Sequence, residues 1–178
     1  MDKLEFTTPE GQQPDREQLW LCLNVGTREN PDWQPLCYGT PSASTSVDWQ
    51  KSTETDVLGN VHPKLKKPQK TQEFSPLPFV VGQKAVEYLF EVCVWDEDAR
   101  KASNMDVLEV YRFAKKKGGT GMAAKRYLGS CVETTGYGGE GGDGLDMPIT
   151  VTYGGTMQKG TVTLGENDVI SFTKDDTL

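Results

Sequence analysis

The chain has 178 residues and a formal net charge of −7, and 35% of its residues are hydrophobic. This length fits one compact domain, and the acidic charge excludes a duplex-binding protein, whose affinity would come from Lys and Arg that neutralise phosphates. The longest apolar run, at 92–95, is far shorter than the roughly 20 residues of a spanning helix, so we expect no membrane insertion.

The N-terminus and the cysteines both indicate a protein that is made and kept in a cytoplasm. Residues 1–5 contain neither a basic leader nor an apolar run of the kind that directs secretion. Cys22, Cys37, Cys93 and Cys131 are scattered without a close pair, which favours reduced thiols over disulfides.

The first part of the chain predicts a flexible arm followed by a strand. Residues 1–16 are polar and contain Gly, Pro and Gln, so we expect a flexible N-terminal arm. Residues 17–25 then have the composition of a β-strand.

The segment 41–78 has the pattern of a long hairpin. Ser and Thr alternate with apolar residues such as Val47 and Trp49 before a Gly-Asn turn at 59–60, and a Lys-rich run follows at 64–70. Neither side carries enough large apolar residues to form its own core. We therefore expect the hairpin to project from the body and to pack on a partner.

One helix is predicted at 82–101. Apolar residues recur there at i, i+3, i+4, i+7 and i+8 from Val86 to Val94, which places one apolar stripe against a sheet. The acidic run 96–98 lies towards the far end, where the helix dipole disfavours it, so an earlier end is the alternative.

The rest of the chain reads as strands. Alternating or extended segments lie at 105–114, 125–135, 149–153, 161–164 and 169–173. The order of strands, arm, helix and strands predicts an α+β, mainly β chain with a single domain over 1–178. We expect an antiparallel β-sandwich with one flanking α-helix and a long projecting hairpin arm.

The Gly-rich stretch 136–144 satisfies the dinucleotide-binding string twice. That fingerprint needs a helix immediately downstream, but a strand follows here, and Glu140 and Asp143 would repel phosphate. The stretch also contains most of a calcium-binding nonapeptide, which binds calcium only when several copies stack. We therefore expect a mobile loop and no cofactor.

No combination of residues indicates catalysis or a metal site. The only histidine, His62, lies beside the predicted hairpin turn, where a surface position is expected. The scattered cysteines do not provide the close Cys/His pairs of a zinc site. Carboxylates such as Asp96 and Asp98 are interpreted as solvated charge. We expect no catalytic, cofactor-binding or metal-binding residues and no enzymatic activity.

The Lys-rich run of the hairpin is the one basic patch of an acidic chain, and two interpretations stay open. Lysines on an exposed strand prevent unwanted strand pairing. They can also dock on an acidic face of an identical neighbour, supplied by Glu140, Asp143 and Asp146 or by the acidic C-terminus. Such a head-to-tail contact generates rings or filaments. The candidate inter-subunit or ring-stacking residues are Trp49, Lys51, Lys64, Lys66, Lys67 and Lys70.

Several segments resemble the major tail tube proteins of long-tailed bacteriophages. They are the hairpin segment 45–70, the helix that starts near Gly82, the strand pair at 127–133, and the Gly-rich loop that leads into 146–153. The resemblance covers most of the chain and rests on the order and texture of these segments rather than on an invariant motif.

This resemblance implies a protomer of a hexameric ring with a fold like that of tail tube and type VI secretion tube subunits. Rings of that family stack into a hollow tube, a long loop or hairpin reaches the adjacent ring, and phage DNA passes through the lumen without specific binding. The implied partners are identical subunits and tail components such as tape measure, terminator and baseplate proteins. The implied location is the virion tail, after assembly in the host cytoplasm.

Two alternatives remain from the sequence. A tail terminator or head-to-tail connector could share the sandwich but would stop at one ring. A ligand-binding β-sandwich module could use Trp20, Trp33, Trp49 and Trp95 as a stacking platform, although Trp20 and Trp95 fit a core better.

Overall fold

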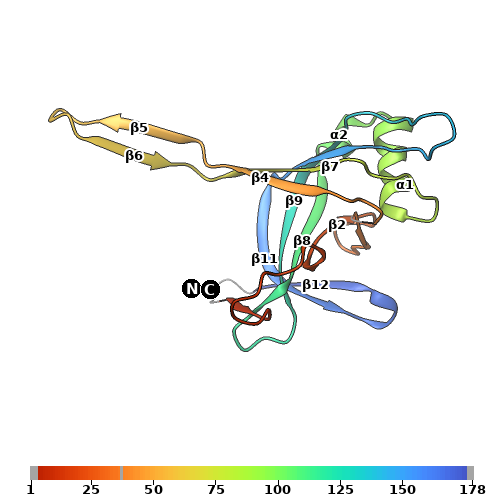
Figure 1. Ribbon diagram of the computed structural model, residues 1–178, viewed down its shortest axis with the longest axis horizontal. Coiled ribbons are helices and arrows are strands. Elements are labelled where there is room, and N and C mark those ends of the chain that lie inside the picture. Colours follow the sequence, from red (N-terminus) through yellow and green to blue (C-terminus); the bar gives the residue numbers. More distant parts are fainter. Residues whose placement is uncertain (1–3, 37, 176–178) are drawn as a thin grey trace.

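The structure is a computed structural model that describes residues 4–36 and 38–175, and within them the architecture is mainly β (Figure 1). The strands are β1 (Leu4–Phe6), β2 (Leu19–Asn24), β3 (Trp33–Pro35), β4 (Ala43–Asp48), β5 (Lys51–Thr55), β6 (Val61–Leu65), β7 (Gln69–Phe74), β8 (Met105–Lys116), β9 (Met122–Thr134), β10 (Ile149–Thr152), β11 (Thr156–Leu164) and β12 (Ile170–Lys174). The helical segments are α1 (Lys84–Phe90), the π-helical η2 (Glu91–Trp95), α2 (Ala99–Ala102) and the 3-10 turns η1 (Arg16–Gln18) and η3 (Glu166–Asp168).

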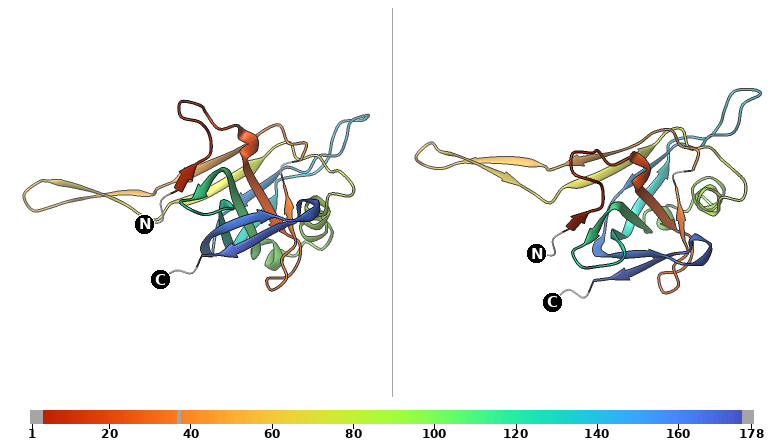
Figure 2. Two further views of the ribbon diagram at one scale, coloured as in Figure 1. Left: turned by 90° about the horizontal axis from the view of Figure 1, so that it is seen from below. Right: turned by 60° about the horizontal axis from the view of Figure 1, so that its bottom comes forward.

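All strands except β5 and β6 join one antiparallel sheet, whose main path runs β3-β2-β8-β9-β10-β7-β4. The sheet divides at β9. One edge of β9 pairs with β8, and the other edge pairs with β11 along its first half and with β10 along its second half. A branch of β11 and β12 therefore leaves the main path, and the whole sheet curls like half a barrel (Figures 1 and 2).

This pairing corrects the predicted β-sandwich, because the two halves share β9 instead of stacking as separate sheets. The crossing from β10 to β11 brings two backbones into close approach. Gly155 has a φ of 64°, and a Cβ there would lie 1.6 Å from the Leu128 carbonyl oxygen. Only glycine fits such a position.

Hydrophobic clusters cover both faces of β8. Val107 belongs to the cluster that includes Leu89 of α1, and its neighbour Leu108 belongs to a second cluster with Trp33. Adjacent residues of a strand point to opposite faces, so a continuous buried run at 105–110 is the expected result. This run places charged side chains of β8 inside the protein.

The predicted helix 82–101 is interrupted. This agrees with the alternative that the helix ends early because of its acidic run 96–98. Helical structure ends at Trp95, Glu97 adopts a left-handed φ of 50°, and Asp98 caps α2 by accepting hydrogen bonds from two backbone N–H groups. The predicted apolar stripe faces the core, since Val86 and Leu89 are buried and Phe90, Cys93 and Val94 are partly buried against the same cluster. The expectation that Trp95 packs in a core is wrong, because its side chain is 79% exposed beside the interruption.

Within the described residues, the predicted N-terminal arm 1–16 is docked on the sheet. β1 pairs with the end of β8, and the rings of Phe6 and Phe113 stack. Arg16 then donates hydrogen bonds to the carbonyl oxygens of Leu19 at 2.7 Å and Ala43 at 2.9 Å. This guanidinium links the start of β2 to β4, which is the last strand at the opposite end of the main path. The link between these distant strands stabilises the curl of the sheet.

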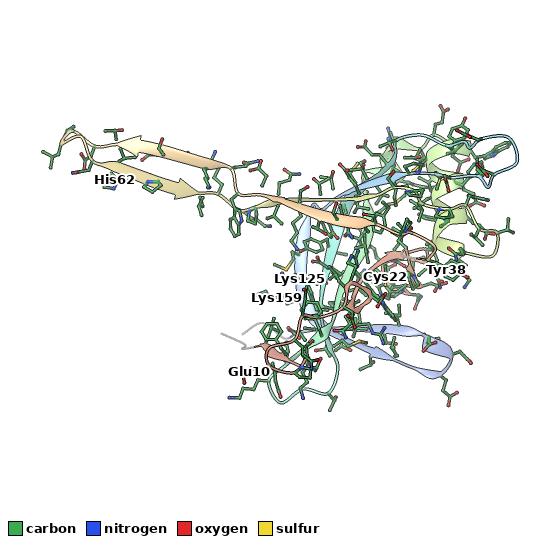
Figure 3. The ribbon with its side chains drawn as sticks, in the orientation of Figure 1. Glu10, Cys22, Tyr38, His62, Lys125 and Lys159 are labelled. Carbon is green, nitrogen blue, oxygen red and sulfur yellow. The ribbon has the colours of Figure 1, made fainter. Side chains whose placement is uncertain are left out.

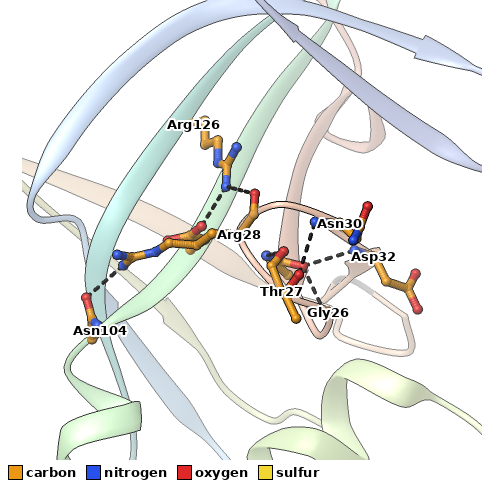
Figure 4. Close-up of polar contacts among 9 residues, drawn as sticks. Gly26, Thr27, Arg28, Asn30, Asp32, Asn104 and Arg126 are labelled. Carbon is orange, nitrogen blue, oxygen red and sulfur yellow. Dashed lines mark hydrogen bonds and ion pairs between the residues drawn. The ribbon is translucent and has the colours of Figure 1, made fainter.

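A buried carboxylate organises the loop between β2 and β3 (Figure 4). The Asp106 side chain is 2% exposed and lies 2.7 Å from the guanidinium of Arg126 and 3.3 Å from that of Arg28. Arg28 also donates to the Asn104 side chain. The Asn24 side chain holds the same loop by hydrogen bonds to its backbone.

Cys93 and Cys131 are free thiols in the structure. Burial raises the pKa of the Cys93 and Cys131 thiols, which disfavours their reactive thiolate forms. Cys22 is buried, and Cys37 lies outside the described residues. In the part of the chain that the structure describes, no helix is long and apolar enough to cross a membrane.

Candidate assembly surface

The segment 43–74 forms a two-part hairpin that leaves the body (Figure 1). Its first part, β4 and β7, belongs to the main sheet, where Ala43 faces Phe74 and Asp48 faces Gln69. Its second part, β5 and β6, pairs only with itself. We call this second part, residues 49–66, the arm.

The turn at the tip of the arm is held by one carboxylate. Asp56 accepts hydrogen bonds from the backbone N–H groups of Leu58 and Asn60, each at 2.9 Å, and from the Asn60 side chain. The His62 ring lies 2.9 Å from the same carboxylate. The hydrogen bond from His62 and those from Asn60 lower the pKa of Asp56 to about 2. His62 therefore has a structural partner at the tip.

The arm exposes apolar side chains that contact no core. Val57 and Leu58 at the tip are almost completely exposed. The further exposed apolar residues along the hairpin are Val47, Trp49, Val61 and Leu65. Exposed apolar side chains that gather on one element mark sites of protein contact.

The structure brings together most of the predicted inter-subunit residues and separates one of them. Trp49, Lys51, Lys64 and Lys66 lie on the arm, and Lys67 lies in the link between β6 and β7. The Lys64 ammonium pairs with Glu54 across the arm. Its charge is thus largely balanced within the chain.

Lys70 lies apart from the arm, inside the junction with the body. Its ammonium is 2.9 Å from the Glu109 carboxylate, whose side chain is 5% exposed. The hydroxyl groups of Tyr111 and Tyr127 also donate to Glu109. Burial by itself would lower the pKa of Lys70, but the charge and hydrogen bond of Glu109, together with the contribution of Tyr127, outweigh it and the pKa is raised.

Sequence reasoning missed this buried network. Glu109 and Tyr111 belong to the same face of β8, and a charged residue in a long strand looks like a solvent-facing position. The only signal in the sequence is that Glu109 interrupts an otherwise apolar run. This interruption does not indicate which residue pairs with Glu109.

The strand order leaves outer sheet edges that no other strand covers among the described residues. β3 and β4 end the main path, and each pairs there with a single strand. Unpaired edges present backbone N–H and C=O groups that can add a strand from another chain. β4 is the longer of the two and continues into the arm.

No family model and no curated protein matches the chain. Similar solved structures come from contractile injection systems. A sheath/tube terminator of the extracellular contractile injection system PVC, in the extended state, is 10% identical over 84% of this chain and 99% of that chain, with a TM-score of 0.47.

Two further structures are of the same kind. A chain of the PVC sheath-tube complex is 11% identical over 86% of this chain and 94% of that chain, with a TM-score of 0.45. The tube terminating cap of the anti-feeding prophage is 12% identical over 94% and 96%, also with a TM-score of 0.45. At TM-scores below 0.5 these are similarities and assign neither a family nor a function.

Proposed function

We propose that the chain is a structural subunit of a tail-like tube assembly and that its arm binds a neighbouring subunit. The observation that carries the proposal is the arm itself. A two-stranded hairpin is only marginally stable in water, and this one displays Val57 and Leu58 to solvent without a core beneath them. Packing on another subunit would bury these side chains.

The sheet edges support the same proposal. Pairing of β4 with a strand of another subunit would satisfy its outer backbone groups, and repetition around a ring would leave no edge open. In the form that the family resemblance implies, the ring is hexameric, rings stack, and DNA passes through the lumen without specific binding. Tape measure, terminator and baseplate proteins are the further proposed partners, and we propose no enzymatic role.

A tube terminator is the alternative within this proposal. The same arm and the same edges would serve a single ring that sits on the end of a tube. The two roles differ in one property, since a tube subunit repeats along the axis and a terminator does not.

Negative-stain electron microscopy of the purified protein at high concentration tests the proposal. Hollow tubes of stacked rings are expected for a tube subunit, and single rings for a terminator. A protein that stays monomeric at every concentration and salt level would contradict both roles.

A variant without the arm provides the matched control. Because Asp48 and Gln69 face each other at the end of the body, residues 49–66 can be replaced by Gly-Asn, which together with Lys67 and Pro68 closes a four-residue loop without changing the main sheet. This variant should keep the circular dichroism of a folded β protein and lose the contacts between subunits.

A further inference from the structure

A basic pocket of about 240 Å³ lies where the hairpin joins the body. Its lining includes Lys67, Lys70, Lys125, Tyr127, Tyr153 and Met157. Lys125 on β9 and Lys159 on β11 are direct cross-strand partners, and Figure 3 shows them close together on the side of the body below the arm. We call this pocket, together with the neighbouring Lys159, the basic pocket.

The basic pocket has more positive charge than the chain itself balances. Glu109 is already occupied by Lys70 and Tyr111. Among residues 4–36 and 38–175, no carboxylate forms an ion pair with Lys125 or Lys159. Like charges directly opposite each other on neighbouring strands are destabilising.

The titration of Lys125 agrees with this excess. Burial, followed by the charge of Lys70, lowers its pKa, while Glu109 acts in the opposite direction. Lys159 adds a further unfavourable charge. A carboxylate supplied from outside the chain would relieve the repulsion between these ammonium groups.

The Gly-rich loop, residues 136–144, carries carboxylates that suit this pocket. Glu140 and Asp143 are exposed, and among the described residues neither side chain forms an ion pair. The base of the loop is fixed by paired backbone hydrogen bonds between Gly138 and Asp146. The loop therefore presents its two acids on a defined protrusion.

Several glycines of this loop are not required by the backbone conformation or by close contacts within the chain. Gly136, Gly141 and Gly144 have no left-handed φ, and a Cβ at each of them would meet nothing within 4 Å. Glycine in such open positions costs conformational entropy on folding, and no contact within the monomer offsets that cost. A slender loop that enters a pocket of another molecule accounts for them.

The other acidic segments are less suitable. Asp146 is tied to Gly138 by its backbone and is partly buried, and Asp175 near the C-terminus pairs with Lys116 of its own chain. Figures 1 and 2 show the Gly-rich loop at the end of the molecule opposite the arm. A chain cannot fill its own basic pocket, whereas a head-to-tail neighbour can.

We propose that the basic pocket binds the Gly-rich loop of a second copy, so that Glu140 and Asp143 of that copy lie beside Lys125 and Lys159. The inference rests on the proposed self-assembly and names the contact that propagates it. The proposed contact differs from the one predicted from the sequence. The acidic groups would bind at the base of the hairpin instead of at the lysines of the arm.

Disulfide trapping tests the contact directly. A chain that carries both Lys159→Cys and Asp143→Cys should form a ladder of covalent multimers on a non-reducing gel when it assembles, and the ladder should collapse with reductant. The matched control pairs Asp143→Cys with Lys51→Cys on the arm, and the single variants control for the native cysteines. Both substituted lysines are exposed, so the variants should fold.

Charge reversal provides the second measurement. Lys125→Glu with Lys159→Glu should raise the concentration needed for half-maximal assembly by roughly tenfold or more, because like charges then meet at the contact. Glu140→Lys with Asp143→Lys should have the same effect, and the chain with all four changes should recover most of the loss.

The outcomes separate this inference from the proposed function. Assembly of the wild-type protein without a ladder, or without recovery by the double reversal, would overturn the pocket contact and leave the proposed function in place. A wild-type protein that never assembles would overturn both.

Discussion

The Lys70 ammonium lies 2.9 Å from the Glu109 carboxylate, at the point where the projecting hairpin meets the sheet. The two residues are 39 positions apart in the chain and join β7 to β8, which are not neighbours in the sheet. This ion pair fixes the root of the hairpin to the inside of the curl.

Removal of Lys70 should therefore destabilise the body rather than the arm. Lys70→Met leaves Glu109 buried without its cation, and we expect a loss of about 3 kcal/mol in the free energy of unfolding, measured by urea denaturation. Lys51→Met, on the exposed arm, is the control and should change it by less than about 0.5 kcal/mol. Equal effects of the two substitutions would show that Glu109 does not depend on Lys70.

Asp106 should be as sensitive as Lys70. Asp106→Asn keeps the shape of the side chain but removes the charge that faces Arg28 and Arg126, so we expect a loss of about 3 kcal/mol in thermal or urea unfolding. Asp96→Asn, at an exposed position of the interrupted helix, should be close to neutral. A small effect at Asp106 would show that the two guanidinium groups do not need a negative charge between them.

The order of the arm tip should depend on acid pH. The pKa of Asp56 is about 2 in the folded turn against a usual value of 3.8, so the ionised form stabilises the turn. This contribution is present above about pH 4 and is lost as the pH falls through about 2. The protection factors of the amides at 58–62, measured by NMR against the intrinsic exchange rate at each pH, should fall over that interval. Asp56→Ala should show low protection factors at every pH, and a tip that is equally protected in both proteins would contradict this role.

Two glycines should respond in opposite ways to substitution by alanine. Gly155→Ala places a Cβ against the Leu128 carbonyl at a left-handed φ, so we expect a loss of more than about 2 kcal/mol or a failure to fold. Gly141→Ala should leave the stability of the monomer unchanged or slightly raised, because its surroundings are open. Thermal unfolding of both variants checks this, and a tolerated Gly155→Ala would mean that the crossing between β10 and β11 relaxes easily.

The local features of the fold could be predicted because each has a local cause. The Gly-Asn sequence at 59–60 lies at the turn of the hairpin, and alternation identifies the flanking strands. The acidic run 96–98 interrupts the helix near its C-terminal end, where the helix dipole disfavours negative charge. In both places, neighbouring residues supply the whole physical reason.

Features that depend on distant contacts could not be predicted. The sequence favours a core position for Trp95, but the interruption beside it leaves the residue exposed. Lys70 continues a run of arm lysines in the sequence and differs from them only because Glu109 lies beside it in space. The division of the sheet depends on the close approach of Gly155 to Leu128. A one-dimensional pattern contains no information on any of these pairs.

The continuity of the hairpin with the main sheet has a mechanical consequence. β7 runs from the arm directly into the body, where its residues from Thr71 to Phe74 pair with β10 and with β4. A pull along the arm acts parallel to these strands and loads their hydrogen bonds together, in shear, instead of opening them one after another. The hairpin can therefore carry tension between neighbouring subunits while the sheet that anchors it stays intact.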